Sequence, residues 1–365
     1  MKEEKKYFPQ LDTIRGISVL TVFIFHSYKP IFGESFFEKF IAFVLAHLGM
    51  GLDVFFILSS FLLTFLGMNE FETTGKFSFK NYFIRRALRI WPLYFIIMFF
   101  SFVILRIVQN YTGHQITLPP AGWYVLFVSN FYLPDHVFFL RLLWTLSVEE
   151  QFYLLWGFCL LVFQKYLKIV ILILAIISLA FIIIQTIKEI GIYFHTLTYI
   201  IDMMFGAFAA YSIKKNNKIA ATIKILSSQE ELIFYLSFPL LFLGYFLVSF
   251  LVSEVLHNLF TELIRLCFIT YCSVVIIIQM ITEKRKLDLS NYNFLIFTGK
   301  ISFGLYCFHG MVISFGYLFL RKINLSLTPF VTSFCFLIFT YLLAILSYKL
   351  IERPFLKLKD KRRSV

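Results

Sequence analysis

The sequence has few charged residues and leaves no room for a sizeable soluble domain. Charged residues make up 15% of the 365 residues and hydrophobic residues 59%, whereas soluble domains contain about 25% charged residues. Apolar runs follow one another along the whole chain. Because lipid admits only backbones that satisfy their own hydrogen bonds, this pattern predicts an all-α, polytopic membrane protein.

Cysteine is also scarce, and no cysteine spacing suits a metal site. We expect no bound metal, because no single helix places histidines and carboxylates at metal-ligand spacing. The cysteines lie within apolar segments, where we expect them to act as small hydrophobic residues. They are Cys159, Cys267, Cys272, Cys307 and Cys335.

Acidic residues are outnumbered: 21 Asp and Glu stand against 34 Lys and Arg, a net charge of +13. Such an excess can indicate a nucleic-acid partner, but polytopic proteins accumulate Lys and Arg on their cytoplasmic loops. We therefore expect membrane lipids and no nucleic acid as partners. The loop cations fall mostly on the side of the N-terminus, which favours about ten transmembrane helices with both termini cytoplasmic. The basic start precedes no cleavable signal pattern.

Segments of about 20 apolar residues, separated by charges and turn residues, predict ten spans. Residues 1–355 form the expected membrane domain and 356–365 a basic cytoplasmic tail. The one long outer segment, 110–143, is rich in Trp, Tyr and Pro, which predicts a structured cap at the interface. No internal repeat is visible, which weighs against inverted-repeat transporters. The predicted spans are 13–32, 41–67, 90–109, 144–164, 168–187, 196–213, 232–252, 259–281, 297–319 and 329–350.

The first span carries Arg15 and His26, although an ionisable group in a membrane costs at least about 2.5 kcal/mol. The two residues are eleven positions apart, so they share one helix face, with about 16 Å between them along the axis. Asp12 is close enough to pair with Arg15. One interpretation is that Arg15 snorkels to the interface and His26 is a packing residue. The other is that this helix face is functional and runs from the cytoplasmic end of the protein to the middle-to-outer depth of the membrane.

Three further polar residues lie in later spans. His309 is predicted at a depth similar to that of His26, so the two could meet across the bundle, or His309 could be a helix-end residue near the outer interface. Glu149 and Glu150 enter the fourth span together. Because adjacent helical residues point about 100° apart, only one of these carboxylates can face a given site.

Asp53 follows Gly49 and Gly51, and glycines of this kind allow close approach of another backbone or a ligand. At the inner end of the third span, Arg85 and Arg89 share a helix face and Arg86 lies nearby. Planar guanidinium donors suit phosphate, although the positive-inside rule also places arginines here without any function.

Together these stretches resemble the membrane acyltransferase-3 family, the bacterial O-acyltransferases that modify surface polysaccharides. The resemblance rests on six stretches in family order: "LDTIRGISVLTVFIFH", "GLDVFFILSSFLLT", "RRALRIWPLYF", "LWTLSVEEQFYL", "SFGLYCFHG" and "IERPF". The chain departs from the common pattern at Ser60, where Gly is usual, and at Phe303, where Tyr is more frequent.

The resemblance implies a bacterial cytoplasmic membrane enzyme. It would move an acyl group, acetyl in most relatives, from cytoplasmic acyl-CoA to a hydroxyl of a surface glycan or its lipid-linked precursor. Acyl-CoA would be a donor substrate rather than a resident cofactor. The implied catalytic residues are His26, as general base or transient acyl carrier, with Arg15 and Glu149. Arg85, Arg86 and Arg89 would engage the CoA phosphates, and accessory residues are Asp12, Asp53, Glu150 and His309.

Two alternatives stay open. Buried His, Asp, Glu and Arg are equally natural in a proton-coupled transporter or glycan flippase. A non-catalytic family member acting as a membrane subunit is the other. The sequence leaves the acceptor sugar, the acyl group and the oligomeric state undetermined.

Overall fold

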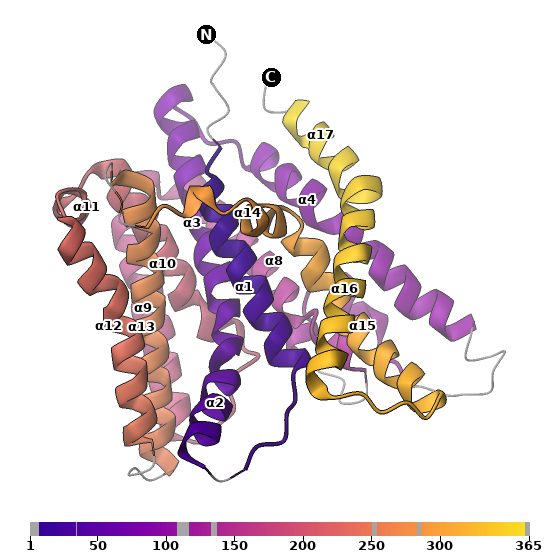
Figure 1. Ribbon diagram of the computed structural model, residues 1–365. Coiled ribbons are helices and arrows are strands. Elements are labelled where there is room, and N and C mark those ends of the chain that lie inside the picture. The colour runs from indigo at the N-terminus through magenta and orange to yellow at the C-terminus, as the bar shows by residue number, and fades with distance from the viewer. Residues whose placement is uncertain are drawn as a thin grey trace.

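The protein is a bundle of long helices in a computed structural model that describes residues 7–33, 35–107, 117–132, 137–249, 254–282, 285 and 287–361 (Figure 1). These residues contain α-helices with short 3-10 and π turns and no strand. Eight helical stretches within these ranges are long and apolar enough to cross a membrane. The prediction of an all-α polytopic membrane protein is therefore confirmed.

Eight of the ten predicted spans overlap these stretches. The other two, 13–32 and 144–164, overlap α1 and α8, which have 19 residues each and are not among the eight. The long helices are α1 (Pro9–Ser27), α2 (Phe36–His47) continuing into α3 (Gly51–Thr74), α4 (Phe79–Phe99), α8 (Trp144–Val162), α9 (Leu167–Ile187), α10 (Thr196–Lys215), α12 (Ser228–Val248), α13 (Glu254–Ile281), α15 (Ser302–Lys322) and α16 (Pro329–Ser347).

Two helix boundaries differ from prediction. The third span was expected from residue 90, but α4 begins at Phe79, where the Ser78 hydroxyl caps the helix by accepting from the Asn81 amide. The arginines therefore lie within its first three turns. The ninth span, 297–319, is divided: α14 (Asn293–Lys300) ends before Ile301, and α15 starts at Ser302.

Close backbone contacts through glycine hold the centre of the bundle together. A Cβ on Gly16 would lie 2.3 Å from the Leu295 carbonyl oxygen, and a Cβ on Gly206 would lie 2.1 Å from that of Ile57. Any larger residue at either position would push α1 from α14, or α10 from α3. Lipid supplies no hydrophobic force between helices, so membrane helices associate through close van der Waals packing. Small residues such as these glycines allow that packing.

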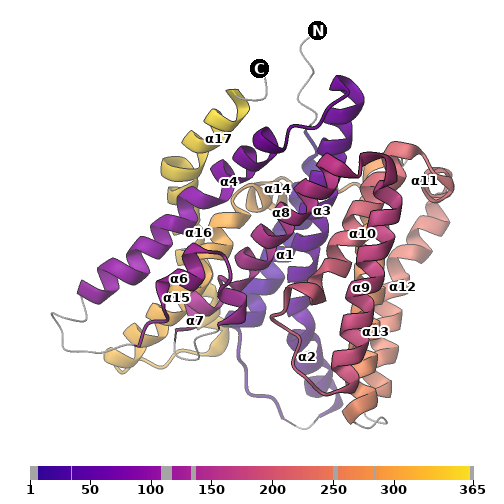
Figure 2. The ribbon, with the colours of Figure 1, turned by 180° about the vertical axis from the view of Figure 1, so that it is seen from behind.

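The helices divide into two groups around α1 and α3. Figures 1 and 2 show α9, α10, α12 and α13 on one side and α4, α15, α16 and α17 (Arg353–Lys361) on the other. The start of α1 and the helix α17 lie at the same end of the bundle, and α2 lies at the opposite end. We call the first the inner end and the second the outer end, following the positive-inside expectation.

The two predicted flanking segments differ in helix content. Within 110–143, the described residues form the short helices α6 (Ala121–Val125) and α7 (Phe138–Arg141) and a 3-10 turn, joined by irregular segments, while 110–116 and 133–136 lie outside the described residues. Within the basic tail, residues up to Lys361 belong to α17, which packs against α4.

Candidate active site

His26 and His309 meet inside the bundle. His309 Nε2 lies 3.2 Å from His26 Nδ1, and His309 Nδ1 contacts the Tyr306 carbonyl oxygen one turn earlier in α15. His309 is 2% exposed, so it is a buried residue rather than one at the outer interface. The structure thus brings together two residues that the sequence placed only at a similar depth.

The contacts of His309 determine where the protons of the neutral pair lie. A carbonyl oxygen can only accept, so His309 Nδ1 carries the hydrogen and its Nε2 is an acceptor. His26 Nδ1–H therefore donates to His309 Nε2. His26 Nε2 keeps its lone pair, which is the form that a general base or nucleophile needs.

His26 borders a cavity of about 350 Å³ between α1, α3, α8 and the outer cap. Phe138 packs against the His26 ring, with the two ring centroids 5.6 Å apart. Arg141, at the end of α7, lines the same cavity and lies over the Phe194 ring, 5.2 Å from its centroid. Nothing in the sequence around Arg141 marks it as part of a motif, so the sequence alone does not single it out.

A second, smaller cavity of about 70 Å³ lies toward the inner end, and three arginines that were predicted as site residues line it. Arg15, Arg86 and Arg89 line it together with Glu149. As predicted, Arg15 pairs with Asp12, Nη1 to Oδ1 at 2.9 Å. The guanidinium of Arg86 lies 5.7 Å from the centre of the Tyr153 ring.

Glu149 is bound by hydroxyl groups on two helices. Tyr153 donates to Glu149 Oε2 at 2.9 Å and Ser59 donates to Oε1 at 3.1 Å. We expected Glu149 to partner either His26 or the acceptor hydroxyl; in the structure His26 Nδ1 contacts His309 Nε2, and the contact of Glu149 with the acceptor stays a prediction. Glu150 is buried and does not line the cavity, which agrees with the expectation that only one of the two carboxylates can face it.

Arg85 does not join the other two arginines. Its Nη2 lies 2.9 Å from Glu70 Oε2, at the end of α3, and it does not line the cavity. Arg85, Arg86 and Arg89 were all expected to engage the CoA phosphates; the structure shows Arg85 paired with Glu70, and the role of the three arginines stays a prediction. The pair that faces inward is Arg86 and Arg89, which are three residues apart and equally close on a helix.

The two cavities share walls. Leu52, Thr145 and Tyr306 line both of them. The Thr145 hydroxyl lies 2.6 Å from the Tyr306 hydroxyl, which donates to the Leu142 carbonyl at 2.7 Å. A row of polar groups thus leads from the arginines to His26 through an otherwise apolar core.

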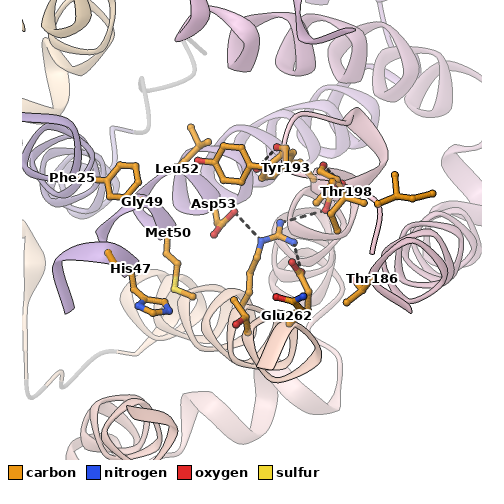
Figure 3. Close-up of a pocket in the computed structure, with 18 of the residues that line it drawn as sticks. Phe25, His47, Gly49, Met50, Leu52, Asp53, Thr186, Tyr193, Thr198 and Glu262 are labelled. Atoms are coloured by element: carbon orange, nitrogen blue, oxygen red, sulfur yellow. Dashed lines mark hydrogen bonds and ion pairs between the residues drawn. The ribbon is translucent and has the colours of Figure 1, made fainter. Parts of the chain in front are cut away.

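A third cavity, of about 600 Å³, lies at the outer end and contains Asp53 (Figure 3). Asp53 Oδ1 accepts from Arg265 Nε at 3.2 Å, and Arg265 Nη2 reaches Asp202 Oδ2 at 2.6 Å. Arg265 Nη1 also lies 3.4 Å from Oε2 of Glu262, one turn earlier in the same helix. The sequence could not predict the stronger contacts, because Asp53, Asp202 and Arg265 belong to three different helices.

This outer cavity adjoins the histidine cavity through Phe25, Gly49, Leu52 and Tyr193, which line both. Tyr193 lies in the loop between α9 and α10, and burial raises the pKa of its phenol to about 12. The hydroxyl therefore stays protonated at any physiological pH and can donate a hydrogen bond. Three adjoining cavities thus follow one another from the arginines to the outer end, with His26 at the middle one.

These cavities and ionisable side chains lie inside a bundle of helices that are long and apolar enough to cross a membrane, which is the architecture of a polytopic membrane protein. The acyltransferase domain family matches residues 8–349, so the chain belongs to the acyltransferase-3 family. This confirms the resemblance carried by the six motif stretches. No solved structure gives a significant match.

Two relatives illustrate the family. A Staphylococcus aureus protein named "Putative O-acetyltransferase" is 26% identical over 97% of this chain and 58% of its own length. Peptidoglycan O-acetyltransferase OatA of Listeria monocytogenes is 30% identical over 45% of this chain and 26% of its own. The chain therefore spans less than two thirds of the length of the curated relatives it matches.

Proposed function

We propose that this protein is a transmembrane O-acyltransferase of the bacterial cytoplasmic membrane. It takes an acyl group, acetyl in the first instance, from cytoplasmic acyl-CoA and transfers it to a hydroxyl of a cell-surface glycan or its lipid-linked precursor. The observation that carries the proposal is the His26–His309 pair, placed between an arginine-lined inner cavity and a polar outer one. The names of the relatives support O-acetyl transfer.

In this reaction His26 acts as the general base. Its Nε2 takes the proton of the acceptor hydroxyl while the hydroxyl oxygen attacks the thioester carbonyl carbon. The carbon–sulfur bond then breaks, and the CoA sulfur leaves with the proton from the imidazolium, which returns His26 to its neutral form. His309 is a positioning residue, because its acceptor nitrogen fixes the tautomer of His26.

The oxygen of the thioester carbonyl gains negative charge in the transition state and needs donors. Of the described residues that line the histidine cavity, Arg141 is the cation, and the Tyr193 hydroxyl is a second donor. We assign the stabilising role to these two. Neither was singled out by sequence motifs.

The inner cavity is the entry for the thioester. At about 70 Å³ it has room for a few water molecules but not for a CoA chain, so the aromatic walls Phe55 and Phe303 must move for the donor to enter. Arg15, Arg86 and Arg89 supply the guanidinium groups for its phosphates. A site that opens only for the donor keeps water from hydrolysing the thioester.

The test has two parts. Glycans from a deletion strain are compared by mass with those from a strain carrying the gene, and we expect the deletion to yield a surface polymer lighter by one acyl group. Inverted vesicles containing the full chain are then given labelled acyl-CoA, and we expect thioester loss to equal acyl ester formed on the glycan. A transporter or flippase would move glycan without consuming thioester, and that result would refute the proposal.

A further inference from the structure

The outer cavity has a lining unlike that of the other two. With a volume of about 600 Å³ it falls within the range of roughly 300–1,000 Å³ that small-molecule sites occupy. It lies at the end of the bundle opposite the arginines, and Figure 3 shows Phe25 and Leu52 apart from Thr198 and Glu262, with Asp53 between the two groups. One wall is therefore rich in hydrogen-bonding groups and another is apolar.

The hydrogen-bonding groups suit hydroxyls. Asp53 and Glu262 offer carboxylate oxygens, which accept from hydroxyls, and Asn258, on the exposed side of α13, offers both a donor and an acceptor. Tyr193 and Tyr199 add flat aromatic surfaces, held together by a hydrogen bond from the Tyr199 hydroxyl to the Tyr193 carbonyl at 2.7 Å. A sugar ring presents hydroxyls at its rim and C–H groups on its faces, so both kinds of wall find a partner.

The charges of the lining disfavour an anion. Three carboxyl groups line the cavity, those of Asp53, Glu189 and Glu262. The guanidinium that lines it, Arg265, is already held by Asp53 and by the buried Asp202. His47, the other basic residue of the lining, has its Nδ1 2.7 Å from the Phe43 carbonyl and so is oriented by its own helix. An incoming phosphate or carboxylate would meet excess negative charge, which costs binding energy at close range.

We infer that this cavity is the acceptor site, that it takes a neutral, hydroxyl-rich sugar unit, and that anionic groups of the acceptor stay outside it. The inference rests on the proposed transfer reaction, because it names the substrate class that reaches His26. The passage is short: Phe25, Gly49 and Tyr193 border both the outer cavity and the histidine cavity. A hydroxyl of a sugar bound on the outer side can therefore point toward His26.

Binding of two matched trisaccharides to the full chain in lipid nanodiscs tests the inference. The probes are cellotriose and the same trimer oxidised to a carboxylate at each C6, which differ only in charge at that carbon. We expect saturable binding of cellotriose and about tenfold weaker binding of the oxidised trimer. Equal or tighter binding of the oxidised trimer, or no saturable binding of cellotriose, overturns the inference.

Two single-charge variants locate the effect. Glu262→Gln removes a carboxylate from the cavity, so the difference in dissociation constant between the two trimers should shrink by several-fold. Glu38→Gln removes a carboxylate at the same outer end but outside the cavity, and Gln can keep the capping contact with Ser35. That control should leave both dissociation constants unchanged. A shift in Glu38→Gln as large as that in Glu262→Gln would place the binding elsewhere.

A His26→Ala variant separates this inference from the proposed function. We expect it to bind cellotriose as the wild type does while transferring no acyl group. Transfer by the wild type without any trimer binding would overturn the acceptor site alone. Normal binding without transfer by the wild type would overturn the proposed reaction alone.

Discussion

The inner and outer cavities differ in size and in charge. The inner one has about 70 Å³ and is lined by three arginines and one carboxylate, Glu149. The outer one has about 600 Å³ and is lined by three carboxyl groups and one arginine, Arg265. The cavity that His26 borders lies between them and shares lining residues with each. In the reaction that we propose, this contrast assigns an anionic donor to the arginine-lined inner cavity and an uncharged polyol to the outer one.

The largest effect should come from removing the group between the two cavities. His26→Ala should lower the rate of acyl transfer by about 100- to 10,000-fold, the usual contribution of a general base. Expression and thermal unfolding should stay near those of the wild type, because the His26 ring borders a cavity rather than filling the core. Transfer is measured in vesicles with labelled acyl-CoA. A fully active variant would remove His26 from the mechanism.

Substitutions in the ion-pair cluster at the outer cavity should lower the free energy of unfolding rather than the rate of acyl transfer. Arg265→Met leaves Asp53 and Asp202 without their guanidinium, and breaking a buried pair in this way costs about 3–5 kcal/mol. Glu262→Gln is the matched control: its contact with Arg265 is 3.4 Å long and partly exposed, so the loss should stay below about 1 kcal/mol. Denaturation in detergent micelles measures both. Similar losses in the two variants would contradict the assigned contacts.

His309 should matter through His26 and not through its own chemistry. His309→Ala removes the acceptor that orients His26, and we expect a fall in turnover of about 10- to 100-fold. His309→Gln should recover part of that loss, because its amide oxygen can accept from His26 Nδ1. A purely structural role predicts that Gln and Ala are equally impaired, so kcat for the pair of variants decides between the two roles.

The smallest effect separates the three motif arginines. Arg86→Gln or Arg89→Gln should raise the KM for acyl-CoA by about tenfold, which corresponds to the loss of a hydrogen bond to a charged group. Arg85→Gln should change that KM far less, because Arg85 is bound to Glu70 outside the cavity. Steady-state kinetics with varied acyl-CoA measure this. Equal KM values in all three variants would show that the inner cavity does not select the donor.

Much of the site could be predicted because it follows from spacing within one helix. The period of 3.6 residues placed Arg15 and His26 on one face, paired Arg15 with Asp12, and separated Glu149 from Glu150. The same reasoning did not distinguish Arg85 from Arg89. Arg85 has the right angle, but Glu70 at the end of the preceding helix holds it, and that partner lies outside the arginine motif.

The contacts that decide the chemistry join helices far apart in the chain. His309 meets His26 from α15, and Arg265 meets Asp53 and Asp202 from α13. Nothing in the local sequence indicates which distant side chain will share a cavity. Arg141 was missed for the same reason, since it reaches the histidine cavity only through the fold of the short helix α7.

By itself the sequence determined that the protein is an all-α polytopic membrane protein, and which polar residues are costly enough to need a purpose. These follow from the free energy of transferring each side chain into lipid, which depends on the residue and its helix alone. Only the tertiary structure decided which of these ionisable side chains pair with one another. Glycines such as Gly16 and Gly206 set how closely α1 approaches α14 and α10 approaches α3, and the packing of α15 against α1 brings His309 to His26.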